Sequence, residues 1–437
     1  MQVASTLAND EGDAAPHARA VGPHPGLDRW AVAAIVAGNA LEFYDFLAYT
    51  TFAVYIGKAF FPMRTELASL LLSLATFGVG FFTRPLGGLL IGAYSDRAGR
   101  RPALVLTISL MALGTLAVAV TPPYATIGIA APLILVAARL IQGLALGGEV
   151  GPSTAALLEC APPGRGGAYI SWQASSQGMA ILTAGLVGFV LGVVLNKEQL
   201  ADWGWRVPFA LGLIVVPVGL YIRRRLPETL LAPGTRRSSD VLRLVWQGHR
   251  RSLVLAILIG MCLTITAYVL TYMTTYSLTT LGLPASTSML STLTLGVIFV
   301  AGAFSSGRLA DRFGRKPVMI LSRIAVIVAV YPAFAFLVGE RTGWALVSVT
   351  ALLSVLGLPS IVAAQTAVIE IFPNQVRSCA FAIGYAVSVA IFGGTTQFVI
   401  AWLIGVTGDP LSPAYYVILT SLISLWAMFQ LPETRKS

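Results

Sequence analysis

Charged residues are scarce in this chain of 437 residues. They make up only 11% of the sequence, whereas hydrophobic residues make up 56%. Soluble globular domains have about a quarter of their residues charged. The composition therefore excludes an ordinary soluble domain and indicates a protein that lies in a lipid bilayer.

Cysteine and histidine are also rare, with three residues of each type. Cys160, Cys262 and Cys379 lack the spacing of a metal site, and they predict no disulfide framework. No set of nucleophile, base and metal ligands converges by spacing. We therefore expect no enzyme activity, no metal site and no cofactor.

Long apolar stretches, in contrast, are abundant in the sequence. A helix needs about 20 mainly apolar residues to span the hydrocarbon core, and the sequence contains twelve such stretches, six in each half. They predict an all-α membrane protein with twelve transmembrane helices in two six-helix halves. The predicted spans are 30–54, 67–94, 102–121, 130–158, 168–193, 206–223, 252–276, 286–308, 317–338, 344–368, 379–405 and 413–430.

The formal net charge of +10 does not indicate a nucleic-acid partner, because membrane topology accounts for it. Most of the 29 Lys and Arg residues fall in the segments on the side of the N-terminus. The positive-inside rule then predicts that both termini are cytoplasmic in a multi-pass protein of the bacterial inner membrane. No apolar signal-peptide region precedes Trp30, so we expect no cleaved signal.

A charged segment occurs twice at equivalent places. Gly92–Arg101 (GAYSDRAGRR) recurs about 215 residues later as Gly307–Lys316 (GRLADRFGRK), and later landmarks repeat in the same order. This duplication predicts two parallel halves with a site between them. The expected division is a disordered cytoplasmic tail (1–29), an N-terminal bundle (30–223), a cytoplasmic linker (224–251), a C-terminal bundle (252–431) and a cytoplasmic tail (432–437).

Five ionisable residues lie inside the predicted helices: Glu42, Asp45, Arg84, Arg139 and Glu149. A charge within the bilayer costs at least about 2.5–3.5 kcal/mol and tends to mark a transport pathway. Their helices carry polar stripes, which we expect to face a common cavity. A static ion pair that fixes helix packing is the alternative. Arginine does not release its proton near neutral pH, and the histidines lie outside the helices, so a carboxylate must carry any proton.

Two motifs resemble those of a known family. The Gly-x-x-x-Asp-Arg-x-Gly-Arg-Arg/Lys runs resemble motif A of the major facilitator superfamily, and Arg139–Gly143 (RLIQG) resembles its fourth-helix motif. Four further segments resemble the metabolite:proton symporter branch: Gly38–Asp45 (GNALEFYD), Arg84–Gly88 (RPLGG), Gly147–Glu149 and Asp202–Phe209. Within that branch, Ser171–Gln177 and Thr407–Tyr415 most resemble the bacterial citrate and tricarballylate proton symporters. Glu42, Asp45 and Arg84 lie in segments that resemble osmolyte porters as well.

The resemblance implies roles for individual residues. Asp45 occupies the position of a proton acceptor that pairs with Arg139, and Glu42 and Glu149 are further candidates for carrying the proton. Arg84 is expected to hold a substrate carboxylate, because a guanidinium binds a carboxylate through two hydrogen bonds. The other expected substrate contacts are Asn39, Tyr49, Arg139, Gln142, Gln173, Ser176, Gln177, Thr395 and Gln397.

The motif A copies imply a cytoplasmic gate held by salt bridges. Its expected members are Asp96, Arg97, Arg100, Glu159 and Glu228 in the first half, and Asp311, Arg312, Arg315, Glu370 and Glu433 in the second. Arg323 lies seven residues beyond Lys316, and we expect it to extend to the cytoplasmic face. Tyr268, Tyr272 and Tyr276 repeat every four residues and fit either helix packing or a gate.

The function expected from this resemblance is proton-coupled import of an organic di- or tricarboxylate, such as citrate or tricarballylate, by alternating access. The coupling ion would be the proton, and the protein would work as a monomer in the lipid bilayer. Uptake of betaine or proline, or of another carboxylate such as 2-oxoglutarate or shikimate, is the alternative. A membrane receptor is disfavoured because the short loops leave no room for a soluble output domain.

Overall fold

The computed structural model describes residues 29–98, 100–147, 154, 157–158, 161–162, 164–225, 248–373 and 376–434. The expected tails (1–29 and 432–437) and the linker fall largely outside this part of the chain, and their boundaries stay predictions.

The first half of the described chain forms six membrane crossings, one of which is split in two. The elements are α1 (Arg29–Thr51), α2 (Ala53–Phe60), α3 (Glu66–Phe82), α4 (Arg84–Ala98), α5 (Arg100–Val120), α6 (Tyr124–Ile127), α7 (Ala130–Gly147), α9 (Gly166–Val194), α10 (Lys197–Asp202), η1 (Gly204–Arg206) and α11 (Val207–Arg225). Together α3 and α4 make the second crossing.

The second half repeats this plan with six further crossings. They are α13 (Arg250–Thr279), α14 (Ala285–Phe313), α15 (Arg315–Glu340), α16 (Gly343–Glu370), the composite of α17 (Arg377–Ser388), the π-helix η2 (Val389–Gly393) and α18 (Gly394–Thr407), and α19 (Ser412–Gln430). Within the described residues, ten helices are long and apolar enough to cross a membrane. Helices α1 and α11, of 23 and 19 residues, complete the twelve, and the predicted fold class is confirmed.

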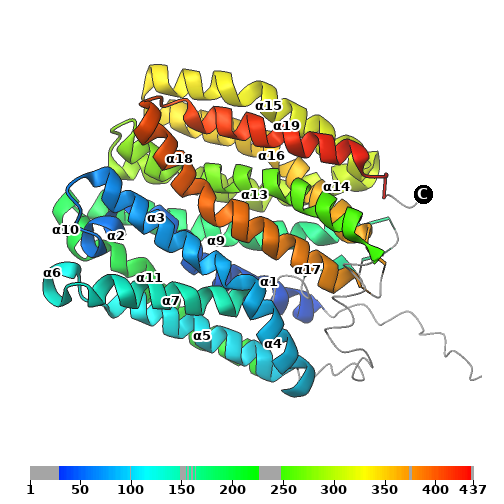
Figure 1. Cartoon of the computed structure of the whole chain (residues 1–437), viewed down its shortest axis with the longest axis horizontal. Helices are drawn as coiled ribbons and strands as arrows, with labels where there is room; N and C mark the ends of the chain where they lie inside the picture. The colour runs from blue at the N-terminus through cyan, green and yellow to red at the C-terminus, as the bar shows by residue number, and fades with distance from the viewer. Residues whose placement is uncertain are drawn as a thin grey trace, which may run out of the picture.

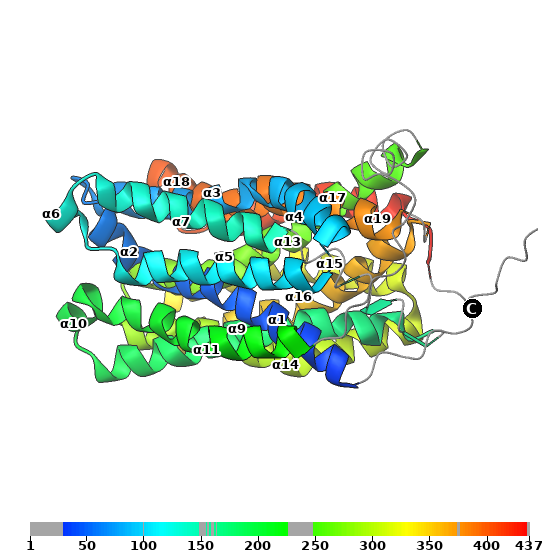
Figure 2. The ribbon, with the colours of Figure 1, turned by 90° about the horizontal axis from the view of Figure 1, so that it is seen from below.

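The long helices run alongside one another (Figure 1). The start of α1 and the end of α19 lie at one end of the bundle, and α6 and α10 lie at the other (Figures 1 and 2). An even number of crossings in each half produces this arrangement.

Helices α9 and α14 pack side by side and join the two halves. A Cβ atom on Gly178 would lie 2.8 Å from the backbone nitrogen of Val300, and one on Gly296 would lie 2.4 Å from the Cα of Leu182. The two backbones therefore approach too closely for larger side chains. Small residues commonly serve this purpose in membrane helix pairs, where close packing provides the attraction.

The second crossing breaks just before Arg84. Pro85 has no backbone N–H to donate, so it interrupts a continuous helix but is tolerated in the first turn of a new one; α3 ends at Phe82 and α4 begins at Arg84. The hydroxyl of Thr83 lies 3.1 and 3.0 Å from the backbone oxygens of Gly80 and Leu140 and can donate its one hydrogen to either. These contacts hold the junction against α7.

Candidate functional site

The polar face of α1 lies inside the N-terminal bundle. Asn39, Glu42, Asp45 and Tyr49 are all buried. Asn39 donates to the Oγ of Ser176 at 2.6 Å and accepts from the Nε2 of Gln173 at 3.0 Å. These three predicted substrate contacts bind one another and join α1 to α9.

Asp45 and Arg139 are connected by intervening side chains. Nη1 of Arg139 donates to Oε1 of Gln142 at 2.7 Å, and Nε2 of Gln142 donates to the hydroxyl of Thr115 at 3.1 Å. That hydroxyl donates in turn to Oδ2 of Asp45. We call these four side chains the Asp45–Arg139 chain. Within the described part of the molecule, the two charged residues form no direct salt bridge, although they interact electrostatically.

Thr115 is a member of this chain that the sequence did not single out. It lies on α5, and its hydroxyl also contacts the backbone oxygen of Met111 at 2.9 Å. The only available signal was a hydroxyl residue within an apolar span, and such residues are common there because their hydroxyls bind a carbonyl of their own helix.

Arg139 is fully buried and stacks on an aromatic ring. Its guanidinium carbon lies 3.7 Å from the centre of the Tyr49 ring, and the hydroxyl of Tyr49 donates to the backbone oxygen of Ser73 at 3.1 Å. The Nε and Nη2 atoms of Arg139 have no hydrogen-bond partner among the described residues. Stacking and a single side-chain hydrogen bond therefore hold this cation.

Arg84 is placed by close packing of α4 on α7. A Cβ atom on Gly147 would lie 1.9 Å from the backbone oxygen of Arg84, and one on Gly87 would lie 2.0 Å from that of Leu144. Only glycine allows this approach, which explains two of the glycines in the Arg84–Gly88 and Gly147–Glu149 segments. The glycines hold the backbone of Arg84 against the fourth crossing.

The guanidinium of Arg84 is 4.0 Å from the centre of the Phe81 ring and 4.8 Å from that of Phe46. It is buried, and its three nitrogens make no hydrogen bond of normal geometry with any described residue. Tyr268 of the other half lies within hydrogen-bonding range of it, and Glu42 of its own half and Tyr385 of the other half are near enough to interact with it electrostatically. Arg84 is thus a cation at the boundary between the halves.

A cavity lies between the two halves, lined by residues of α1, α9, α13, α14, α16 and α17. On α1 its wall is formed by Phe43 and Leu47 rather than by Asp45, so the expectation that the polar stripe of α1 faces the common cavity is wrong. Among the described residues, no charged side chain lines the cavity. Its polar lining consists of Gln177, Thr264, Tyr268, Thr271, Gln365, Tyr385 and Ser388.

The two residues predicted on the eleventh crossing have different surroundings. Nε2 of Gln397 donates to the hydroxyl of Thr271 at 3.2 Å, so Gln397 lies just behind the cavity wall. Thr395 donates to the backbone oxygen of Ile391 on its own helix, at 2.6 Å in an exposed position. The structure does not bring Thr395 together with the other predicted contacts.

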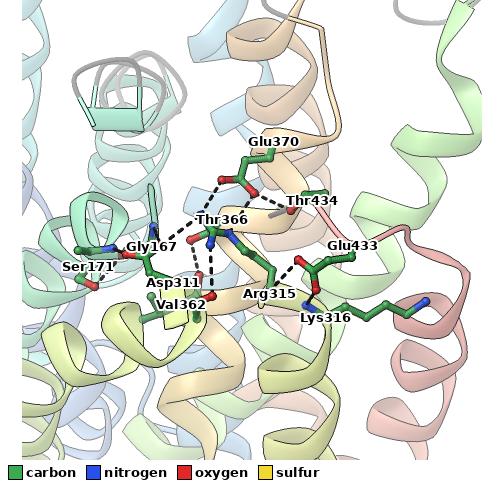
Figure 3. A network of polar contacts seen from close by, with 12 residues as sticks. Gly167, Ser171, Asp311, Arg315, Lys316, Val362, Thr366, Glu370, Glu433 and Thr434 are labelled. Atoms are coloured by element: carbon green, nitrogen blue, oxygen red, sulfur yellow. Dashed lines mark hydrogen bonds and ion pairs between the residues drawn. The ribbon is translucent and has the colours of Figure 1, made fainter. Parts of the chain in front are cut away.

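The second motif A copy forms a network that reaches the N-terminal half (Figure 3). The carboxylate of Asp311 accepts from the backbone nitrogens of Gly167 and Ala168, at 2.8 and 2.9 Å. These nitrogens belong to the first turn of α9, where unpaired N–H groups attract an anion. Asp311 therefore binds one half of the molecule to the other.

Arg315 joins the remaining acidic residues of this network. Its Nη2 lies 3.1 Å from Asp311 Oδ1 and 3.1 Å from Glu370 Oε1. Glu433 accepts from the backbone nitrogens of Arg315 and Lys316, at 3.0 and 2.9 Å (Figure 3). Figure 3 also shows Thr434, which ends a repeated Leu-Pro-Glu-Thr segment but was not among the expected gate residues; its hydroxyl donates to Glu370 at 2.5 Å.

The other predicted gate and proton-carrier residues do not belong to the contacts given above. The guanidinium of Arg312 is exposed and lies 5.3 Å from the centre of the Phe313 ring. Glu149, Glu159 and Glu228 lie outside the described residues, as do the side chains of Asp96, Arg97 and Arg100.

Arg323 does not extend to the surface, and the expectation that it does is wrong. Its exposed fraction is 0%. Nη1 donates to the hydroxyl of Thr266 at 2.8 Å, and Nη2 donates to that of Ser360 at 3.3 Å. These hydroxyls on α13 and α16 provide hydrogen-bond acceptors in the interior, so the side chain stays within the C-terminal bundle.

Comparisons with known proteins agree with this architecture. Residues 35–395 match the Major Facilitator Superfamily. The chain is 37% identical to the citrate-proton symporter of Klebsiella pneumoniae, with 91% of this chain and 90% of the relative covered. It is 33% identical to the proline/betaine transporter of Salmonella typhimurium, with 94% and 84% covered.

Solved structures support the fold alone. The D-xylose-proton symporter superposes with a TM-score of 0.74 at 20% identity, with 93% of this chain and 98% of that chain covered. The family match spans most of the twelve crossings, and the relatives cover both halves. The chain therefore belongs to the major facilitator superfamily and is a multi-pass membrane transporter rather than an enzyme.

Proposed function

We propose that the protein is a proton-coupled symporter that imports an organic di- or tricarboxylate, such as citrate or tricarballylate, by alternating access. The observation that carries the proposal is the buried guanidinium of Arg84, which lies at the boundary of the halves without a hydrogen bond of normal geometry among the described residues. A carboxylate is the group that a guanidinium binds best. The similarity to the citrate-proton symporter favours the same substrate class.

In this proposal Asp45 carries the proton, with Glu42 and Glu149 as the other candidate carriers. Its Oδ1 has no hydrogen-bond partner among the described residues and lies 2.8 Å from the place that a Cβ atom on Gly212 would occupy. Protonation removes the negative charge that faces Arg139 across the chain. The resulting loss of attraction loosens the contacts among α1, α5 and α7 and allows the loaded carrier to reorient.

The network around Arg315 acts as the cytoplasmic gate in this mechanism. Arg315 is only 2% exposed, and its two ion pairs lie largely out of water. The hydration that buried charges lose offsets much of their mutual attraction, so these pairs can form and break during each cycle. Closing this end requires the start of α9 to meet Asp311. In this proposal the end that carries the gate faces the cytoplasm. Both termini lie on that same cytoplasmic side, and the protein lies in the bacterial inner membrane.

The lining of the cavity favours a second candidate, a zwitterionic osmolyte such as betaine or proline. Five aromatic rings line it, those of Phe43, Tyr268, Phe299, Phe381 and Tyr385. Aromatic rings attract quaternary ammonium groups, and Arg84 would bind the carboxylate of the same molecule. The similarity to the proline/betaine transporter is consistent with this alternative.

Uptake into proteoliposomes tests both candidates. Purified protein is reconstituted, and accumulation of labelled citrate is measured with an inward proton gradient and after a protonophore collapses that gradient. We expect gradient-dependent accumulation that unlabelled tricarballylate blocks and betaine does not. Accumulation of betaine or proline without citrate uptake would establish the osmolyte function instead.

A further inference from the structure

The geometry points to a carboxylate site shared by the two halves, in which Arg84 of the N-terminal half and Tyr268 and Tyr385 of the C-terminal half bind the same carboxylate group. This inference rests on the proposed function and adds to it the residues of the second half. We call these three side chains the carboxylate clamp.

Tyr268 connects the cavity to Arg84. It lines the cavity and also interacts with the guanidinium. Its ring contacts those of Phe77 and Phe81, with centroid distances of 6.0 and 5.5 Å. Because these contacts from α3 fix the ring, the hydroxyl is held near the cation before a ligand arrives.

Tyr385 lies within electrostatic range of the same cation, on a different helix. It lies on α17, lines the cavity and interacts electrostatically with Arg84. Its ring stacks on that of Phe381 at a centroid distance of 6.0 Å. The two tyrosines therefore come from α13 and α17, and the cation comes from the first residue of α4.

The chemistry of these groups fits one carboxylate. Two oxygens can accept from the guanidinium and from both hydroxyls, and hydrogen bonds to a charged group are stronger than neutral ones. Without a ligand, Arg84 has aromatic rings on its faces and no hydrogen bond of normal geometry among the described residues. A bound carboxylate would satisfy a buried cation that is otherwise costly to maintain.

The clamp has a consequence for alternating access. A ligand shifts an equilibrium between conformations only by its difference in affinity for them. A carboxylate held from both halves binds best when the halves are close together, so it stabilises the closed, occluded arrangement. A molecule without this group lacks the interaction that draws α4 towards α13 and α17.

Gln365 extends the site away from Arg84. It lines the cavity on α16, and its Oε1 is buried without a hydrogen-bond partner among the described residues. A carbonyl oxygen accepts a hydrogen bond, so it fits a hydroxyl or a protonated carboxyl group of the substrate. The site therefore combines one strongly bound carboxylate with neutral polar contacts.

The test measures counterflow of labelled citrate in proteoliposomes, which reports binding and exchange without a proton gradient. We expect the Tyr268→Phe and Tyr385→Phe variants to raise KM about tenfold each, because each removes a hydrogen bond to a charged group, while the maximal rate changes less. Tyr272→Phe, one turn further along α13 and absent from the cavity lining, is the matched control and should leave KM unchanged. The Arg84→Gln variant should abolish saturable binding.

Two results would overturn the inference and can be told apart. If wild-type protein exchanges citrate and the Arg84→Gln variant does not, but both tyrosine variants keep the wild-type KM, the clamp is wrong and the proposed function stands. If wild-type protein neither exchanges nor accumulates any di- or tricarboxylate, the proposed function and the clamp both fail.

Discussion

Nη1 of Arg323 donates to the hydroxyl of Thr266 at 2.8 Å and thereby joins the ninth crossing to the seventh. Ser360 on the tenth crossing accepts from the same guanidinium. The Asp45–Arg139 chain joins the first, third and fourth crossings of the other half. The two halves therefore have buried polar contacts on equivalent helices, but the charge lies on a different helix in each.

The first prediction concerns the stability of the C-terminal half. Arg323→Lys should lower the melting temperature of the purified protein, because an ammonium cannot reach both Thr266 and Ser360 with the spacing of a guanidinium. A hydrogen bond lost by a buried charge costs about 1–3 kcal/mol. Arg308→Lys, at an exposed position on α14, is the control and should leave the melting temperature unchanged. An equal melting temperature for Arg323→Lys and wild type would contradict the interpretation.

Much of the fold could be predicted from the sequence. The length of each apolar stretch matches the thickness of a bilayer and so predicts a crossing, and the duplicated charged segment predicts two equivalent halves. The site was harder to predict. Glu42, Asp45 and Arg84 stand out as charges within apolar spans, but only packing shows that Phe43 and Leu47 take the cavity-facing side of α1. The expectation that Arg323 extends to the cytoplasmic face came from its distance along the helix alone. That distance does not reveal the hydroxyls on neighbouring helices that accept hydrogen bonds from its guanidinium.

The second prediction isolates the proton carrier. Asp45→Asn removes the ionisable group, while the new amide oxygen can still accept from Thr115. Proteoliposomes with this variant should lose gradient-driven accumulation of citrate and keep counterflow, because binding and exchange require no net proton movement. Glu42→Gln, which changes another buried acid of α1, is the matched comparison and should keep accumulation. Accumulation at the wild-type level by Asp45→Asn would remove Asp45 as the carrier.

The third prediction concerns Thr115, whose hydroxyl accepts a hydrogen bond from Gln142 and donates one to Asp45. Thr115→Val keeps the shape of the side chain and removes the hydroxyl, so the connection between α5 and Asp45 is lost. Gradient-driven uptake should fall about tenfold, the size expected for a hydrogen bond to a charged group, and counterflow should change less. Ser109→Ala on the same helix removes a hydroxyl that bonds to Val105 in an exposed position and serves as the control. Unchanged uptake by Thr115→Val would show that the chain has no part in coupling.

The fourth prediction tests how Asp311 holds the halves together. Asp311→Asn replaces an anion at the first turn of α9 with a neutral group, and such an interaction contributes roughly 0.3–2 kcal/mol. The contact between α9 and α14 should then open more often. The measurement is the rate at which a polar thiol reagent labels a Ser171→Cys variant whose native cysteines are replaced; Ser171 is buried beside Gly307 in this contact. Labelling should rise several-fold with Asp311→Asn and stay constant with Asp409→Asn, which changes the turn between α18 and α19. Equal labelling with and without Asp311→Asn would mean that the packing of the two helices, rather than the carboxylate, keeps this end closed.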